Sequence, residues 1–109
     1  MKISNLLNQD QVTLSFEVFP PKTSSTYESV AQATQEIAAL RPDFMSVTYG
    51  AGGGTSEQTV HIASDLQKKY GVTVLTHLTC VSSTKEHVAT MLEKFRQQGI
   101  ENVLALRGD

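Results

Sequence analysis

The chain has 109 residues, with nine basic and eleven acidic side chains and a formal net charge of −2. This length suits one small domain, and the near-neutral charge disfavours a nucleic-acid binder, which would carry a basic stripe. No apolar run approaches the roughly 18 residues that cross a bilayer, and the first ten residues lack the apolar core of a secretory signal. The single cysteine, Cys80, cannot form an internal disulfide, so we expect a cytoplasmic protein that binds neither nucleic acid nor a membrane.

Four strand-like segments recur at a regular spacing. They are predicted at residues 12–19, 44–49, 72–78 and 102–106, and successive starts are 32, 28 and 30 residues apart. In the first segment apolar and polar residues alternate, so the two sets are expected on opposite faces. The apolar set is Val12, Leu14, Phe16 and Val18, and the polar set is Thr13, Ser15 and Glu17.

Helical patterns fill the intervals between these strands. Residues 25–28 and 83–86 each form a predicted capping box, and residues 55–58 open the helix between them. Pro42 is expected to end the first helix, and Gly71 and Gly99 the other two. The residues expected to face inward are Val30, Ala33, Ile37, Leu40, Val60, Ala63, Leu66, Tyr70, Val88, Met91, Leu92 and Phe95.

Strict alternation of strand and helix with short loops predicts an α/β fold with parallel strands and right-handed crossovers. An open doubly wound sheet and part of a (β/α)8 TIM barrel both have this pattern. Strands between two helix layers are nearly all apolar, whereas these strands carry Glu17, Ser46 and Thr48. Polar side chains suit the interior of a barrel near its mouth, so the barrel is favoured.

A complete barrel needs roughly 250 residues. Residues 1–109 are therefore expected to be the N-terminal part of a single barrel domain, ending after its fourth strand.

Glu17 is the first candidate for chemistry, since it lies near the carboxyl end of the first predicted strand and faces inward by alternation. In apolar surroundings the pKa of a carboxyl rises, so that it can donate a proton near neutral pH. The alternative is a carboxylate that forms a salt bridge or stands at a solvated strand end.

A glycine-rich turn at residues 50–55 joins the second strand to a helix N-terminus, where backbone N–H groups could receive a phosphate. No lysine follows the last glycine, so this is not a Walker loop. Thr55 replaces the third glycine of a dinucleotide fingerprint. A loop without a ligand fits the pattern equally well.

His77 lies within the third predicted strand, three residues before Cys80. A zinc site needs three or four ligands, and His61 and His87 fall within predicted helices, so no metal is expected. A histidine that only completes the packing of its strand is the alternative to a ligand contact.

The chain closes on Arg107, Gly108 and Asp109 after the fourth strand. Arginine offers a fork of donors, glycine allows close approach of the backbone, and aspartate places a negative charge at the mouth. The tripeptide also resembles a cell-adhesion signal, but that role needs an extracellular loop.

Together these segments resemble the methylenetetrahydrofolate reductase family in its short bacterial form. The matching segments are SFEVFPPK at 15–22, FMSVTYGA at 44–51, THLTC at 76–80 and NVLALRGD at 102–109. They occur in the family's order, each at the end of a predicted strand.

The resemblance implies a flavoprotein on a (β/α)8 barrel. Such an enzyme passes a hydride from NADH or NADPH to FAD, and then from reduced FAD to 5,10-methylenetetrahydrofolate. The product, 5-methyltetrahydrofolate, feeds methionine synthesis, and the parent enzyme is expected to be a homo-oligomer. This 109-residue chain alone is expected to bind FAD poorly and to lack turnover.

By the same resemblance, Glu17 matches the general acid that opens the folate's five-membered ring. Asp109 matches a carboxylate close to the flavin that also contacts folate, and Thr48 matches a nicotinamide contact. The remaining matches are flavin contacts, with Leu106 packed beside them: Tyr49, Ala51, His77, Arg107 and Gly108.

Two other functions stay open on the residues alone. One is a free-standing α/β module that binds a phosphate or nucleotide through residues 50–55. The other is a different barrel enzyme that binds a pterin without a flavin.

Overall fold

A four-stranded parallel sheet forms the centre of the molecule in the computed structural model, which describes residues 1–21, 27–49 and 56–107. Its strands are β1 (Ser15–Val18), β2 (Phe44–Val47), β3 (Val74–Thr79) and β4 (Asn102–Leu106), in the spatial order β1-β2-β3-β4. The helices α2 (Tyr27–Ala38), α3 (Ser56–Tyr70) and α4 (Lys85–Gln97) each follow one strand, and a short α1 (Ile3–Leu7) precedes β1.

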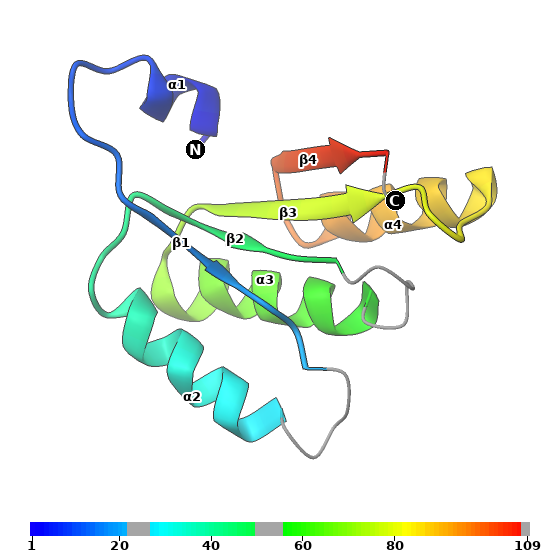
Figure 1. Ribbon diagram of the computed structural model, residues 1–109, viewed down its shortest axis with the longest axis horizontal. Coiled ribbons are helices and arrows are strands. Elements are labelled where there is room, and N and C mark those ends of the chain that lie inside the picture. Colours follow the sequence, from blue (N-terminus) through cyan, green and yellow to red (C-terminus); the bar gives the residue numbers. More distant parts are fainter. Residues whose placement is uncertain (22–26, 50–55, 108–109) are drawn as a thin grey trace.

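The three long helices cover one face of this sheet. A right-handed crossover between neighbouring parallel strands places its helix on a fixed side, so strands that follow chain order keep all their helices on one face. Figure 1 shows α2 and α3 on one side of the sheet and α1 on the other. In α4, Met91 and Phe95 belong to the same buried cluster as Met45 of β2.

This arrangement distinguishes between the doubly wound sheet and the (β/α)8 barrel, which share the same sequence pattern. A doubly wound sheet reverses its strand order and carries helices on both faces. The order β1-β2-β3-β4 with helices on one face is instead consistent with the first half of a (β/α)8 barrel. We call the face without the long helices the open face; by strand alternation it carries Glu17, Ser46, His77 and Thr79.

Two predicted helix ends are confirmed in detail. Gly71 and Gly99 have φ of 66° and 75°, in the left-handed region that suits glycine. After α4, the Gly99 N–H donates to the Arg96 carbonyl and the Ile100 N–H to the Phe95 carbonyl, both at 3.0 Å. This is a Schellman motif, which satisfies carbonyls that the helix end would leave unpaired.

The first predicted strand begins later than its alternation suggested. Val12 is 95% exposed and Leu14 51%, so these two residues do not join the core. The Leu14 N–H donates to Asp43 Oδ2 at 2.7 Å, and the Asp43 N–H donates to the Leu14 carbonyl at 2.8 Å. These bonds hold Leu14 against the loop before β2, so the ladder starts at Ser15.

The first predicted helix ends earlier than Pro42. Its last residue is Ala38, and Leu40, expected to face inward, is 65% exposed. The Arg41 N–H donates to the Ala38 carbonyl at 3.1 Å, and Arg41 has a φ of 56°. This left-handed residue turns the chain out of the helix before the proline is reached.

Other boundaries shift by one or two residues. β2 ends at Val47, and β3 runs from Val74 to Thr79. The predicted cap of α4 moves by one position, because Thr84, rather than Ser83, accepts the bond from the His87 N–H. Residues 25 and 26 of the predicted cap at 25–28 lie outside the described residues, and so does the whole glycine-rich turn at 50–55.

The sequence patterns did not predict α1, which has only five residues and no side-chain cap. Its position depends on Asn102 at the start of β4, whose Oδ1 accepts from the Ile3 N–H at 2.9 Å. The Asn102 side-chain amide donates to the carbonyls of Met1 and Val74. One side chain thus ties the N-terminal segment to two neighbouring strands. Among the described residues no helix has the length and apolar character that crossing a membrane requires.

Replacing Asn102 by alanine is expected to lower the free energy of unfolding by about 1–3 kcal/mol, because the Ile3 N–H and the Val74 carbonyl lose their partner. Urea unfolding followed by tyrosine fluorescence measures this, since the chain has three tyrosines and no tryptophan. The control is Glu101→Ala, which removes an exposed ion pair with the Met1 amine and should cost less than about 0.5 kcal/mol. Equal losses in the two variants would contradict the role given to Asn102.

Candidate functional site

Three polar side chains from three neighbouring strands meet on the open face. Glu17, on β1, is the register partner of Ser46 on β2. The Ser46 hydroxyl donates to Glu17 Oε1 at 3.1 Å, and His77 Nε2, from β3, lies 3.4 Å from the same oxygen. We call these three residues the Glu17 cluster.

Strand alternation explains how the sequence builds this cluster. Phe16 and Val18 turn to the helix side and pack with the core, which leaves Glu17 on the open face. On β3 the buried residues Val74, Thr76 and Leu78 alternate with more exposed ones in the same way. The neighbours on either side of each polar residue turn to the helix side and therefore fix which way the polar side chain points.

The cluster is partly shielded from water. The Ser46 residue is 8% exposed and the His77 side chain 13%, while the Glu17 side chain is 47% exposed. The apolar surroundings that the sequence suggested for the carboxyl are therefore not found, because its neighbours are a hydroxyl and an imidazole. Chemically, Glu17 has one oxygen held by two partners and enough exposure to exchange a proton with a bound molecule.

The other residues expected at the site end up in different places. Thr48 follows β2 and is half-buried; its N–H donates to the Val18 carbonyl at 3.1 Å. Leu106 ends β4 at 37% exposed, and Arg107 after it is exposed. Ala51, Gly108 and Asp109 lie outside the described residues.

Tyr49 is expected to contact flavin, yet its side chain is 1% exposed and belongs to the buried core. Its hydroxyl lies 3.2 Å from Nε2 of His87, in the first turn of α4. The structure therefore places the Tyr49 ring on the helix side of the sheet, away from the Glu17 cluster.

Sequence reasoning did not select two residues that the structure brings to the site. Ser46 was only one of several polar strand residues, and its role depends on the register between β1 and β2. Thr79, on β3, has a hydroxyl oxygen that is buried and has no hydrogen-bond partner in the described part of the chain. A buried hydroxyl without a partner costs about 1–3 kcal/mol.

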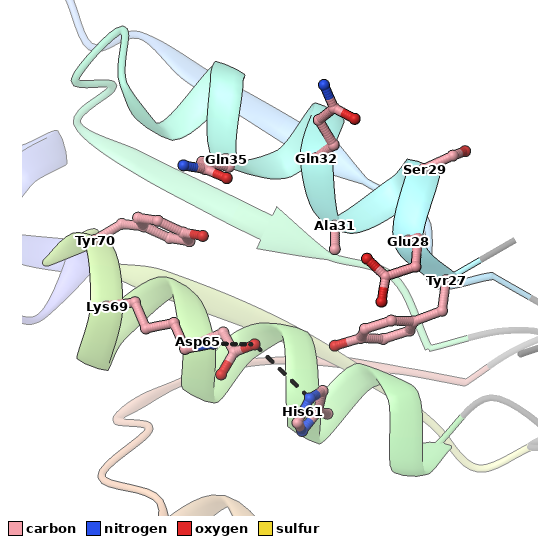
Figure 2. A pocket seen from close by; sticks show the side chains of 10 residues that line it. All are labelled: Tyr27, Glu28, Ser29, Ala31, Gln32, Gln35, His61, Asp65, Lys69 and Tyr70. Atoms are coloured by element: carbon pink, nitrogen blue, oxygen red, sulfur yellow. Dashed lines mark ion pairs between the residues drawn. The ribbon is translucent and has the colours of Figure 1, made fainter.

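A second candidate is a groove of about 690 Å³ between α2 and α3, shown in Figure 2. Tyr27 and His61 lie across from each other in it, with ring centroids 5.5 Å apart. Burial, and next the negative charge of Asp65, raises the pKa of Tyr27 above its ordinary value of 10.0.

Three ionisable side chains of α3 in this groove pair with one another. Asp65 lies 3.6 Å from Lys69 Nζ and 3.7 Å from His61 Nε2, both on its own helix. These contacts at helical spacing explain these three ionisable residues of α3 without a ligand, while Glu28 comes from α2. The Glu17 cluster joins three strands at one partly shielded point, so it is the stronger candidate for a functional site.

Comparisons with known proteins cover nearly the whole chain, including the three strands that carry this cluster. The family model described as methylenetetrahydrofolate reductase matches residues 2–109. The chain is 42% identical over 108 residues to methylenetetrahydrofolate reductase (NADH) 1 of Arabidopsis thaliana, covering 99% of this chain and 18% of that protein. It is 36% identical over 101 residues to 5,10-methylenetetrahydrofolate reductase of Escherichia coli, covering 93% and 34% respectively. To the protein of that name from Buchnera aphidicola it is 38% identical over 108 residues, covering 99% and 36%.

The chain thus spans 34–36% of the length of these two bacterial relatives and 18% of the plant relative.

The contact between Ser46 and Glu17 is expected to show energetic coupling of about 0.5–1 kcal/mol, at the low end for a charged acceptor because Glu17 is half exposed. A double-mutant cycle of Ser46→Ala and Glu17→Ala in urea measures it. The control cycle pairs Glu17→Ala with Ser64→Ala, whose hydroxyl bonds to Gln98 between α3 and α4. If the losses in the free energy of unfolding are additive in the first cycle, Ser46 and Glu17 do not stabilise each other.

In the groove, Asp65→Asn is expected to lower the pKa of Tyr27 part of the way to 10.0, because the charge of Asp65 is one cause of its rise and burial remains. The folded-state pKa of Tyr27 lies above its unfolded value, so its contribution to stability is complete below pH 10.0 and falls as the pH rises further. Titration of the Tyr27 ring by NMR measures the shift, with Glu93→Gln on α4 as a control. A pKa unchanged by Asp65→Asn would rule out the charge effect.

Proposed function

The chain belongs to the methylenetetrahydrofolate reductase family, and we propose that it forms the N-terminal part of a flavin-dependent oxidoreductase that reduces 5,10-methylenetetrahydrofolate to 5-methyltetrahydrofolate with NADH or NADPH. The observation that carries this proposal is the Glu17 carboxyl, held on the open face by Ser46 and His77. All three residues lie within the range that the family model matches, and the relatives bear the reductase name.

The proposed parent domain is a single (β/α)8 barrel, of which residues 1–109 are the first part. Support comes from the parallel order of the strands and from the two outer strands, β1 and β4, each of which pairs with only one strand among the described residues. In a closed barrel these edges would pair with further strands, and the open face would become the barrel interior.

The residues at the carboxyl ends of the strands fit a flavin nucleotide by their chemistry. Such a ligand carries a ring edge rich in nitrogen and oxygen atoms and a negatively charged pyrophosphate. His77 offers polar atoms for the flavin ring, Thr48 offers them for the nicotinamide, and Arg107 offers a cationic fork for phosphate or carbonyl oxygens. When bound, FAD would supply the hydride transfer between the nicotinamide and the folate.

On family resemblance, Thr48 contacts the nicotinamide, and Asp109 contacts both flavin and folate. The fixed negative charge of Asp109 would stabilise the cation that forms on the folate. The remaining residues are flavin contacts, with Leu106 packed beside them: Tyr49, Ala51, His77, Arg107 and Gly108. For Tyr49, whose ring is buried against α4, the contact would come from its main chain.

In the proposed mechanism Glu17 is the general acid. It gives a proton to the ring nitrogen of the folate that leaves when the five-membered ring opens to an iminium, and this raises the rate by about 10²–10⁴. Ser46 and His77 hold Oε1 of Glu17, which orients the carboxyl toward a molecule on the open face. We place the enzyme in the cytoplasm, as a homo-oligomer whose product feeds methionine synthesis.

A hybrid protein tests this function, with this chain replacing the matching first part of the Escherichia coli relative. The hybrid should retain FAD through gel filtration, whereas the 109-residue chain alone should release it and show no turnover. In the hybrid, Glu17→Gln should slow oxidation of the reduced flavin by 5,10-methylenetetrahydrofolate about 10²–10⁴-fold, because only that step needs the acid. Flavin reduction by NADH should be unchanged, and both rates follow from stopped-flow absorbance.

The matched control is Glu101→Gln, a carboxylate at the other end of the sheet, which should leave both steps intact. Equal loss of both steps in Glu17→Gln would contradict the role of Glu17, and a hybrid that stays colourless with added FAD would contradict the proposed function.

A further inference from the structure

Thr79 is the one described residue whose buried side-chain oxygen lacks a hydrogen-bond partner. It is the last residue of β3 and shares the open face with His77, two positions before it. On β4 its register partner is Leu106. The Thr79 hydroxyl therefore belongs to the carboxyl end of the open face, beside the Glu17 cluster.

The same strand offers a direct comparison on its other face. Thr76 is fully buried, and its hydroxyl donates to the Asn102 carbonyl at 3.3 Å. There the hydroxyl has a partner within the fold, as buried polar groups normally do. At position 79 a valine would fill the same space without burying an unpaired oxygen, so the fold itself gives no reason for a threonine.

Thr79 is partly exposed as a residue although its Oγ1 is not, so the exposed surface belongs to its other atoms. Rotation about χ1 moves the hydroxyl among three staggered positions and exchanges it with the methyl group. A ligand on the open face that offers a hydrogen-bonding atom would favour the rotamer in which the hydroxyl points outward.

We propose that Thr79 is a ligand-binding residue, whose hydroxyl rotates to form a hydrogen bond with the flavin ring system on the open face. The identity of the ligand rests on the proposed function, whereas the unpaired hydroxyl does not. The binding of FAD thereby gives the hydroxyl the partner that it lacks in the free chain.

The test is Thr79→Val in the 109-residue chain, with FAD as the probe. The urea midpoint should stay the same or rise, because the valine removes an unpaired buried oxygen. The affinity for FAD, measured by NMR titration at high FAD concentration, should fall about fivefold, as expected for one hydrogen bond.

The control is Thr76→Val, the same substitution on the same strand. It should lower the urea midpoint, because the Asn102 carbonyl loses its donor, and leave the affinity for FAD unchanged. In the wild-type chain, three-bond couplings to the Thr79 methyl carbon report χ1, which should change when FAD is added.

Each of these measurements can overturn the proposal. A lower urea midpoint for Thr79→Val would show that the hydroxyl already has a partner in the free chain. If FAD shifts the amide resonances of Glu17 and His77 but has the same affinity for Thr79→Val as for the wild-type chain, the role of Thr79 is refuted and the proposed function stands. If FAD shifts no amide resonance of the open face at any concentration, the role of Thr79 in this chain is refuted. The hybrid protein then decides the proposed function separately.

Discussion

The handedness of the crossover connections determines most of this structure. Because parallel strands joined through helices cross over to the right, strands that follow chain order place α2, α3 and α4 on one face of the sheet. The buried side chains of β2 and β3 pack against those helices, and the core forms there. The other face is left for side chains that the core does not need, and every candidate for ligand chemistry among the described strand residues lies on it.

The Glu17 cluster follows from that division. Two-residue alternation sends Glu17, Ser46 and His77 to the open face, and the register of β1 against β2 brings the first two within hydrogen-bonding distance. Three strands that are far apart in the sequence thus fix one carboxylate oxygen. A reactive carboxyl on rigid strands is positioned more precisely than one on a loop, which is the physical basis for assigning the acid role to Glu17. In the α2–α3 groove, Asp65 pairs with His61 and Lys69 along a single helix, and these contacts need no ligand.

The sequence predicted the parts of the fold that depend on local patterns. Four strands, three long helices and the glycine stops at Gly71 and Gly99 all appear in the structure. Two boundaries were missed: a contact with Asp43 holds Leu14 outside the sheet, and Arg41, in the left-handed conformation, ends its helix before Pro42. For the site, alternation predicted the inward position of Glu17. Its contact with Ser46 and the unpaired Thr79 hydroxyl depend on register and packing, which no pattern in a single sequence specifies.

Whether the open face is the ligand face is tested by mapping backbone amide chemical shifts in the 109-residue chain as FAD is added to concentrations high enough to detect weak binding. The largest changes are expected on Glu17, Ser46, His77 and their strand neighbours, while the amide shifts of Tyr27, His61 and Asp65 in the groove stay constant. Changes centred on the groove, with the Glu17 cluster unaffected, would contradict this expectation.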